Sequence, residues 1–546
     1  MSKISKLVNT PSLFFKDMIK KPRVAVKAAP KDISYYRNQL LDFKNKYPVS
    51  YFKYQNIDLW PVLRFALWRG LRQSWQKNGA KSKIIPLKTT VSKEAYKVFR
   101  DNYEITELHK LEENIHEFLV FSNVRGVEQT IVQGKIYNKY TDPIYEELIK
   151  VGKTLKIEII KGNSPIQIEA HCMPLRLLPS LTREVGYMIE AELPNNLVSI
   201  LQNNFSSLNI SQKDINDTIE WFMNDYNIYK QILIKLKPKA VFFMGFEFHL
   251  ALSAAARDLG IRSVDVQHGL QTGWGPLYKW WEEIPPTGYN TLPTDFLVWG
   301  NRDKNHLEKE IALKNKANVY ITGFPWIEKQ FLYTEKLNSD ITKKFDKYKA
   351  KILVSLQHQT EIPFKFIQLL NYSIDDIKKN LTNQINILKD EEANTNKIEK
   401  LKNKLSYFQG NIEESEILWI FRKHPKGKNI DLKGIEKRKN VLVSDTIDNV
   451  QIGELLKKVD IHITSSSTVV IEADYFGIHN FIADEDSTGI ENYQDEIEKG
   501  LVSVLDNSKD FYKYIWNNDI TLKESKIDAI SQNNDLLKFI KMIDNE

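Results

Sequence analysis

The sequence has almost no cysteine and no long apolar run. Cys172 is the single cysteine in 546 residues, which excludes an internal disulfide and suits a reducing compartment. No apolar run approaches the roughly 18 residues that a membrane-spanning helix needs. The first residues lead into no secretory signal segment. We therefore expect a cytoplasmic protein.

A strong excess of one charge is also missing. Lys and Arg number 77, Asp and Glu number 70, and the formal net charge is +7. This mild excess suits anionic small molecules or an anionic membrane surface, and it is not typical of a nucleic-acid-binding protein. The sequence has no P-loop, Gly-x-Ser-x-Gly or HExxH motif. The run 484–486 has the spelling of a metal-binding DxD motif, but it fits an acidic loop better, so we expect no metal site.

The N-terminal part reads as a basic leader followed by helices. Residues 1–30 interleave apolar and basic side chains. This pattern is typical of an amphipathic segment on the inner membrane surface, contacting it through residues 1–25, and equally of a helix that packs on its own protein. Pro61 marks a helix start. We expect residues 1–112 to form a helical extension beside the main domains.

From about residue 115, strand-like apolar runs alternate with helical stretches. The expected strands of the first half are 117–121, 154–160, 240–245, 263–267, 295–300 and 319–323. Those of the second half are 351–355, 417–421, 441–443, 459–464 and 480–483. Such alternation predicts doubly wound parallel sheets. We predict an α/β fold of two Rossmann-like domains, 113–335 and 345–510, that face a central crevice.

Two helical additions are predicted in the second half. Apolar residues recur every three or four positions over 374–388 and again over 398–408. This periodicity predicts a helical hairpin over 371–410. The tail, 511–546, also reads as helical, and we expect it to return to the first domain.

Polar clusters follow the predicted strands, where ligands of open α/β sheets bind. In the first half, Gln267-His268-Gly269 follows a strand and leads into a polar loop that contains Gln271. His268 can act as a general base or bind a phosphate, and the plainer alternative is a histidine that stabilises its loop.

The second half contributes three clusters. A basic run after the strand at 417–421 suits an anionic phosphate leaving group. A run of hydroxyl residues after the strand at 459–464 can cap a helix or bind phosphate, and an acidic residue one turn later can accept a ribose hydroxyl. The end of the strand at 351–355 can contact phosphate or base. The candidate donor-binding residues are Ser355, Gln357, Arg422, Lys423, His424, Pro425, Lys426, Ser465, Ser466, Ser467, Thr468 and Glu472.

In this order, over roughly residues 240–500, the clusters resemble GT-B glycosyltransferases that use CMP- or CDP-activated donors. His424-Pro425 resembles the HP motif of bacterial sialyltransferases and capsule Kdo transferases, and Ser465-Ser466 resembles their SS motif. Gln267-His268-Gly269 is similar to the histidine-glycine turn of teichoic-acid polymerases that use CDP-glycerol. The resemblance implies a GT-B fold in which His424 and the serines hold the donor phosphate.

One motif of the sialyltransferases, the acidic-acidic-glycine sequence that supplies their base, has no clear copy here. Our candidates for the base are His268, Glu247 and Asp142, in that order. The expected function is metal-independent, inverting transfer of a CMP-activated acidic sugar, a nonulosonic acid or Kdo, to a glycan or lipid-linked glycan of the bacterial surface. No cofactor beyond the nucleotide-sugar donor is expected. The alternatives are CDP-polyol phosphate transfer, a UDP- or GDP-sugar donor, a GT-B-shaped epimerase and an inactive GT-B scaffold subunit.

Overall fold

The computed structural model describes most of the chain. The described residues are 32–85, 105–122, 129–159, 169–178, 194, 196–273, 275–281, 283–333, 337–357, 361–371, 374–390, 395, 398–402, 416–424, 430–517, 525, 527–531 and 535–545. The predicted basic leader, 1–30, lies outside these residues.

The first domain is built on an eight-stranded sheet with the order β12-β11-β10-β9-β4-β7-β8-β3. Every pairing in this sheet is parallel. Its strands are β3 (Thr106–Glu107), β4 (Phe118–Ser122), β7 (Thr154–Ile159), β8 (Leu175–Leu178), β9 (Ala240–Met244), β10 (Arg262–Val266), β11 (Asp295–Val298) and β12 (Asn318–Ile321). The central strands are apolar and buried along their length, as a sheet covered by helices on both faces requires.

Helices flank this sheet, and the longest begins at a capping box. The side chains of Ser211 and Asp214 each accept a hydrogen bond from the other's backbone N–H, which fixes the start of α7. The helices are α5 (Thr141–Leu148), α6 (Leu197–Asn204), α7 (Gln212–Leu236), α8 (Leu250–Asp258), α9 (Asn301–Leu307), α10 (Leu313–Asn315) and α11 (Trp326–Tyr333). A separate antiparallel hairpin joins β5 (Gln129–Val132) to β6 (Lys135–Asn138).

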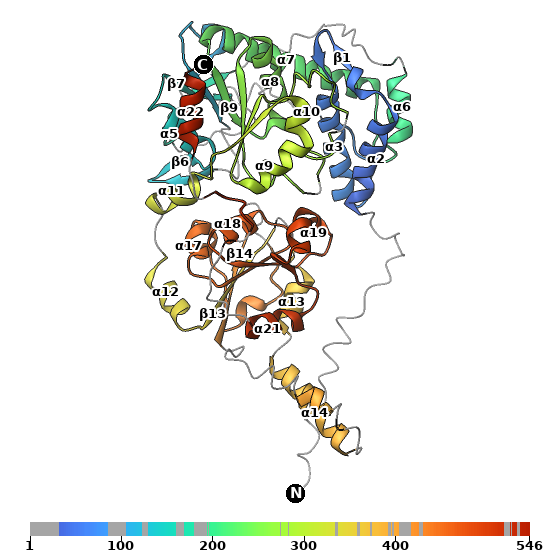
Figure 1. Cartoon of the computed structure of the whole chain (residues 1–546), viewed down its shortest axis with the longest axis vertical. Coiled ribbons are helices and arrows are strands. Elements are labelled where there is room, and N and C mark those ends of the chain that lie inside the picture. The colour runs from blue at the N-terminus through green and yellow to red at the C-terminus, as the bar shows by residue number, and fades with distance from the viewer. Residues whose placement is uncertain are drawn as a thin grey trace.

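The second domain has a six-stranded sheet with the order β15-β14-β13-β16-β17-β18, again parallel throughout. Its strands are β13 (Ala350–Ser355), β14 (Ile417–Arg422), β15 (Val441–Leu442), β16 (Ile461–Thr464), β17 (His479–Ile482) and β18 (Val502–Val504). Its helices are α12 (Ser339–Asp346), α13 (Phe364–Asn371), α16 (Asp445–Asn449), α17 (Ile452–Leu456), α18 (Val469–Tyr475), α19 (Thr488–Asn492), α20 (Gln494–Glu498) and α21 (Ser508–Asn517). The predicted fold class is confirmed: two parallel-sheet α/β domains stand one above the other in the GT-B arrangement (Figure 1).

The N-terminal extension is helical, as predicted, and covers one side of the first domain (Figure 1). It consists of α2 (Ile33–Lys46), a short hairpin of β1 (Lys53–Tyr54) and β2 (Ile57–Asp58), and α3 (Trp60–Gln76) with Pro61 in its first turn. Phe65 of α3 packs against Phe246 and Trp281 of the first domain. The extension is therefore part of the first domain's core.

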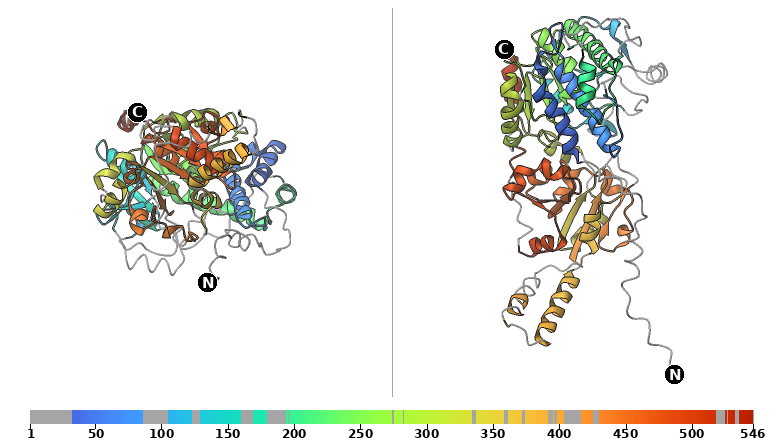
Figure 2. Two further views of the ribbon diagram at one scale, coloured as in Figure 1. Left: turned by 90° about the horizontal axis from the view of Figure 1, so that it is seen from below. Right: turned by 90° about the vertical axis from the view of Figure 1, so that its right-hand side faces the viewer.

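The two other helical additions lie at opposite ends of the molecule. Helix α14 (Ile374–Asp390) extends away from the second domain (Figure 2). Residues 398–402 are helical too, while the rest of the second arm of the predicted hairpin, 403–410, lies outside the described residues. Helix α22 (Leu536–Asp544) packs on the first domain, where Phe539 contacts Phe242.

An apolar cluster joins the two domains. Trp299 and Phe324 of the first domain share a buried core with Val470 and Tyr493 of the second. The backbone N–H of Gly453 also donates to the side chain of Gln330 on α11. Within the described part of the chain, none of the helices is long and apolar enough to cross a membrane.

Candidate active site at the domain junction

The sheet topology places the predicted clusters at two switch points. In the first sheet the strand order reverses between β4 and β9, and in the second between β13 and β16. Open α/β sheets bind ligands beyond the strand ends at such points. Register puts Ser355 beside both Arg422 and Thr464 at one sheet edge. The three clusters of the second half therefore begin side by side.

The turn after β10 is held rigidly by its first residue. Gln267 is fully buried, and its Nε2 donates to the carbonyl oxygen of Gly269 (2.9 Å) and to Asp303 Oδ2 (2.7 Å). Its Oε1 accepts from the backbone N–H of Trp299 (2.7 Å). Gln267 thus positions the turn, because all of its polar atoms already have protein partners.

His268, the next residue, is half-buried at the domain junction. Its ring lies edge-on to Tyr140, with centroids 6.3 Å apart. Its Nδ1 has no hydrogen-bond partner among the described residues. Burial lowers the pKa of His268 to about 4, so the imidazole is neutral at physiological pH and can accept a proton.

Glu247 converges on the same place from the end of β9. Gly245, at a φ of 71°, lies between the two side chains: a Cβ there would be 3.4 Å from His268 Cε1 and 3.5 Å from Glu247 Oε2. Glu247 is only 8% exposed, and its burial raises the pKa of the carboxyl to about 7, against the opposing charge of Arg69 on α3. The structure therefore brings together the first two of the three predicted bases.

A second carboxyl group lies beneath Glu247. Asp265 is fully buried, and burial followed by the nearby charge of Glu247 raises the pKa of Asp265. The hydroxyl of Tyr278 donates to Asp265 Oδ2 over 3.3 Å. Because two adjacent buried carboxylates repel each other, at least one of the pair favours its neutral form.

The third predicted base has a different environment. Asp142 is fully buried, and its Oδ1 lies 2.7 Å from Lys156 Nζ on β7. Its Oδ2 accepts from the backbone N–H of Asn138. This buried ion pair gives Asp142 a structural role in the first turn of α5.

The loop after His268 reaches the second domain. A Cβ at Gly269 would lie 3.6 Å from the methyl group of Thr468, so the histidine turn and the hydroxyl cluster face each other across the junction at close range. Gln271, which follows, is 1% exposed, and its side-chain amide lies beside the hydroxyl of Tyr278. Gln271 therefore lies below the surface of the loop.

Within the hydroxyl cluster, Ser467 holds the loop that leads into α18. Ser467 Oγ accepts from the backbone N–H of Val469 at the start of α18, and Tyr493 donates to the Ser467 carbonyl oxygen (2.6 Å). Ser465 and Ser466 are half-buried. Ser467 holds the turn before α18, so Ser465 and Ser466 remain the hydroxyl candidates for a ligand.

Ser355 belongs to a buried polar chain. Its Oγ lies 3.0 Å from Nε2 of His462, whose Nδ1 lies 2.7 Å from Asn480 Oδ1. Its carbonyl oxygen accepts from Thr464 Oγ1 (2.8 Å). Ser355 thus ties β13 to β16, while Gln357 is half-buried just beyond it.

Two residues of the basic cluster after β14 already contact other parts of the second domain. Arg422 donates from Nη2 to the carbonyl oxygen of Val450 (2.9 Å). Lys423 lies with its Nζ 3.3 Å from Asp448 Oδ2, and its backbone N–H donates to Asp448 Oδ1. His424 is half-buried beside them, and Pro425 and Lys426 lie outside the described residues.

Lys139 of the first domain places a positive charge near Glu472 of the second domain. Burial raises the pKa of Glu472, and the positive charges of Lys139 and Arg422 act against that rise. Lys139 follows β6 and precedes Tyr140, so the loop before α5 contributes both residues to the junction. No local pattern in the sequence signals Lys139, because its proximity to Glu472 arises only when the domains meet.

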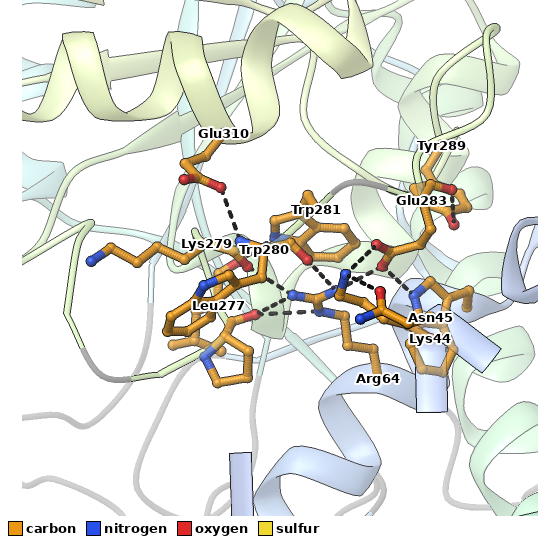
Figure 3. A network of polar contacts seen from close by, with 12 residues as sticks. Lys44, Asn45, Arg64, Leu277, Lys279, Trp280, Trp281, Glu283, Tyr289 and Glu310 are labelled. Atoms are coloured by element: carbon orange, nitrogen blue, oxygen red, sulfur yellow. Dashed lines mark hydrogen bonds and ion pairs between the residues drawn. The ribbon is translucent and has the colours of Figure 1, made fainter. Parts of the chain in front are cut away.

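The N-terminal extension fixes the loop that continues from His268. Arg64 of α3 is fully buried and donates to the carbonyl oxygens of Pro276 (3.0 Å) and Lys279 (2.8 Å) and to Glu283 Oε1 (2.7 Å). Its guanidinium also lies 3.9 Å from the ring centroid of Trp281. Figure 3 shows these contacts converging on Arg64. The extension therefore supports the site through Arg64 and approaches Glu247 through Arg69.

The acidic loop at 484–486 leads into α19 and stabilises the start of that helix. Asp484 accepts from the backbone N–H groups of Asp486 (3.1 Å) and Ile490 (2.9 Å), which sets the first turn of α19. Among the described residues, no group of three His, Cys, Asp or Glu side chains is placed to hold a metal ion.

Gly489 gives a first test of the hydroxyl cluster. A Cβ at this position would lie 1.8 Å from the carbonyl oxygen of Ser465, so Gly489→Ala must displace the Ser465 loop. We expect nucleotide binding, measured by calorimetry, to weaken by roughly tenfold or more, which is about 1.4 kcal/mol. Gly275→Ala is the matched control, since its Cβ would make only ordinary contacts, 3.7 Å from Trp68. Unchanged affinity in a folded Gly489→Ala protein would contradict this role.

No protein-family model matches the sequence, and no curated protein matches it. Among solved structures, the chain is similar to the MnaA–UDP complex of S. aureus, with 12% identity and a TM-score of 0.42 over 78% of this chain and 94% of that one. It is similar to the UDP-GlcNAc 2-epimerase of Neisseria meningitidis bound to UDP-GlcNAc, with 14% identity and a TM-score of 0.37 over 78% and 98%. It is also similar to the wall teichoic acid polymerase TagF, with 11% identity and a TM-score of 0.36 over 79% and 88%.

Proposed function

We propose that this chain is a glycosyltransferase that moves a CMP-activated acidic sugar, a nonulosonic acid or Kdo, onto a bacterial surface glycan. One observation carries the proposal: the turn that presents His268 faces Thr468 across the domain junction, where a methyl group added at Gly269 would reach that side chain, close in sequence to Ser465 and Ser466. A base candidate and a set of phosphate-binding candidates from different domains thus face one place.

The proposed reaction divides the work between the domains. Ser465, Ser466 and His424 bind the donor phosphate, and Glu472 accepts a hydrogen bond from the ribose. His268 takes the proton of an acceptor hydroxyl, whose oxygen attacks the anomeric carbon from the face opposite the phosphate. The bond between that carbon and the phosphate oxygen breaks, its electron pair leaves with CMP, and the configuration inverts.

Polyol-phosphate transfer from a CDP donor is the second candidate. The observation that favours it is the environment of His268, since a neutral, half-buried histidine suits deprotonation of a polyol hydroxyl as well as that of a sugar. In this reaction the acceptor oxygen attacks the phosphorus that bears the polyol, and CMP again leaves.

A donor panel tests both candidates. The full chain is incubated with CMP-sialic acid, CMP-Kdo, CDP-glycerol, UDP-GlcNAc and a GDP-sugar, with a mixture of lipid-linked and free glycans as acceptors. Release of CMP from an acidic-sugar donor is the expected result. Release of CMP from CDP-glycerol alone selects the second candidate, and absence of nucleotide binding in all five mixtures rejects both.

We expect turnover without a divalent cation. The positive charge that the leaving phosphate requires is supplied at the end of β14, where Arg422 and His424 lie. Turnover after exhaustive treatment with EDTA is expected to stay within about twofold of the untreated value, a difference of less than about 0.5 kcal/mol. Loss of turnover that returns with Mg²⁺ or Mn²⁺ would overturn this expectation.

A further inference from the structure

A groove of about 470 Å³ lies between the two domains, beside the loop that presents His268. One wall comes from α9 and the π-helical turn Glu308–Ala312 that continues it, and the other from α19 and α20. Thr272 of the His268 loop also lines it. Its volume falls within the range of small-molecule sites, about 300–1,000 Å³.

The lining of the groove is suited to a saccharide. Amide side chains come from both domains, with Asn301 and Asn305 on one wall and Asn492 and Gln494 on the other. Amides offer donors and acceptors together, as sugar hydroxyls require. Basic and acidic residues line the groove in nearly equal numbers, so its charge selects neither an anion nor a cation. Apart from Leu501 and Ile527 the lining residues are polar, which disfavours a lipid tail.

Two lining residues carry buried polar atoms that lack a partner. His306 Nε2 and Thr272 Oγ1 have no hydrogen-bond partner within the described part of the chain. Burial lowers the pKa of His306 to about 3, so its ring is neutral. Unpartnered buried polar atoms are costly, and a rotation of these two side chains toward the groove would let the hydroxyls of a ligand supply their hydrogen bonds.

One network links the groove to the His268 turn. Arg302 lines the groove, and its Nη1 lies 3.2 Å from Asp303 Oδ1, while Asp303 Oδ2 accepts from Gln267 Nε2. Arg302 also binds both carboxylate oxygens of Glu496, from Nε (2.7 Å) and Nη2 (3.2 Å). A ligand in the groove therefore lies against the residues that join the domains and hold the turn.

We propose that this groove binds the saccharide units of the acceptor chain that lie behind the unit receiving the transferred group. This inference rests on the proposed function, because only a transferase has an acceptor, and it adds the surface on which that acceptor binds. Because the groove takes residues from both domains, acceptor binding holds them together while the His268 turn is in place.

The test fills the groove without touching the catalytic candidates. Asn305 and Gln494 are exposed residues on opposite walls, so Asn305→Trp and Gln494→Trp each add bulk inside the groove while sparing the core. Glu308→Trp is the matched control, since Glu308 is exposed next to α9 but does not line the groove. The probes are an array of defined acidic and neutral bacterial oligosaccharides, and CMP and UDP for calorimetry on the same proteins.

We expect the wild-type chain and Glu308→Trp to bind the same oligosaccharides, and both groove variants to bind them more than tenfold more weakly. All four proteins should bind nucleotide equally. Undiminished oligosaccharide binding by the groove variants, or no oligosaccharide binding by a wild-type chain that binds nucleotide, overturns the inference and leaves the proposed function standing. If groove-dependent oligosaccharide binding occurs without nucleotide binding or release, the proposed transfer is wrong and the acceptor role falls with it.

Discussion

Replacing His268 with alanine is expected to lower kcat by a factor of about 10²–10⁴, the usual contribution of a general base. The half-buried imidazole is neutral and lies at the junction, where an acceptor hydroxyl can reach it. Saturating donor and a fixed acceptor concentration make kcat the measured quantity. His109→Ala is the control, because that histidine is largely exposed and lies outside the junction.

Glu247 offers the competing explanation, and two measurements separate it from His268. Glu247→Gln keeps the shape of the side chain and removes its charge. If His268 is the base, the buried carboxyl of Glu247 only stabilises the imidazolium that forms on His268, and we expect kcat to fall by no more than about tenfold. If Glu247→Gln is inactive while His268→Ala keeps most of its kcat, the carboxylate is the base and our order is wrong.

The pH profile gives an independent answer. A base must be deprotonated, so activity is lost as pH falls through its pKa. With His268 as the base, kcat/KM should be flat from about pH 8 to 6 and fall near the histidine's pKa of about 4. With Glu247 as the base, the fall would come near pH 7. A fall near pH 7 that disappears in Glu247→Gln would assign the base to the carboxylate.

The sheets could be predicted because their central strands have a recognisable sequence pattern. A run such as Ala240–Met244 is apolar along its whole length and ends at a glycine, which is typical of a strand buried on both faces. Strand β18, at Val502–Val504, was not predicted because it is three residues long and two of them are half-buried. The β5–β6 hairpin was missed for the same reason, since most of its residues are not buried.

The site could be predicted only in part, because some of its features depend on residues that are close in sequence and others on contacts between distant segments. Strand-end clusters follow from local sequence, so the positions of His268, Ser465 and His424 just after β10, β16 and β14 could be predicted. Contacts made by distant segments carry no such signal. Lys156 on β7 pairs with Asp142 on α5, and Arg69 approaches Glu247 from the N-terminal extension. These two contacts distinguish Asp142, which is held in a buried ion pair, from Glu247, whose pKa burial raises against the charge of Arg69.

His424→Ala is expected to lower kcat by about 10²–10³, the usual cost of removing one group that stabilises charge developing in the transition state. Negative charge grows on the donor phosphate as the sugar leaves. The register places the end of β14 at the same sheet edge as the hydroxyls after β16, with the end of β13 between them. Because the largest effect belongs to the transition state, kcat should fall by more than donor affinity, and thermal stability should change little.

Lys423→Met is the matched control for this variant. Lys423 is adjacent in sequence and basic, but its ammonium lies 3.3 Å from Asp448, so its charge is already balanced within the fold. We expect this variant to lose less than about tenfold in kcat, which is under about 1.4 kcal/mol of transition-state stabilisation. The two variants are compared in single-turnover reactions with saturating donor, together with their thermal unfolding. Normal turnover by a stable His424→Ala protein would reduce His424 to a residue that shapes the turn after β14. Equal losses in both variants would instead assign the effect to the basic cluster as a whole.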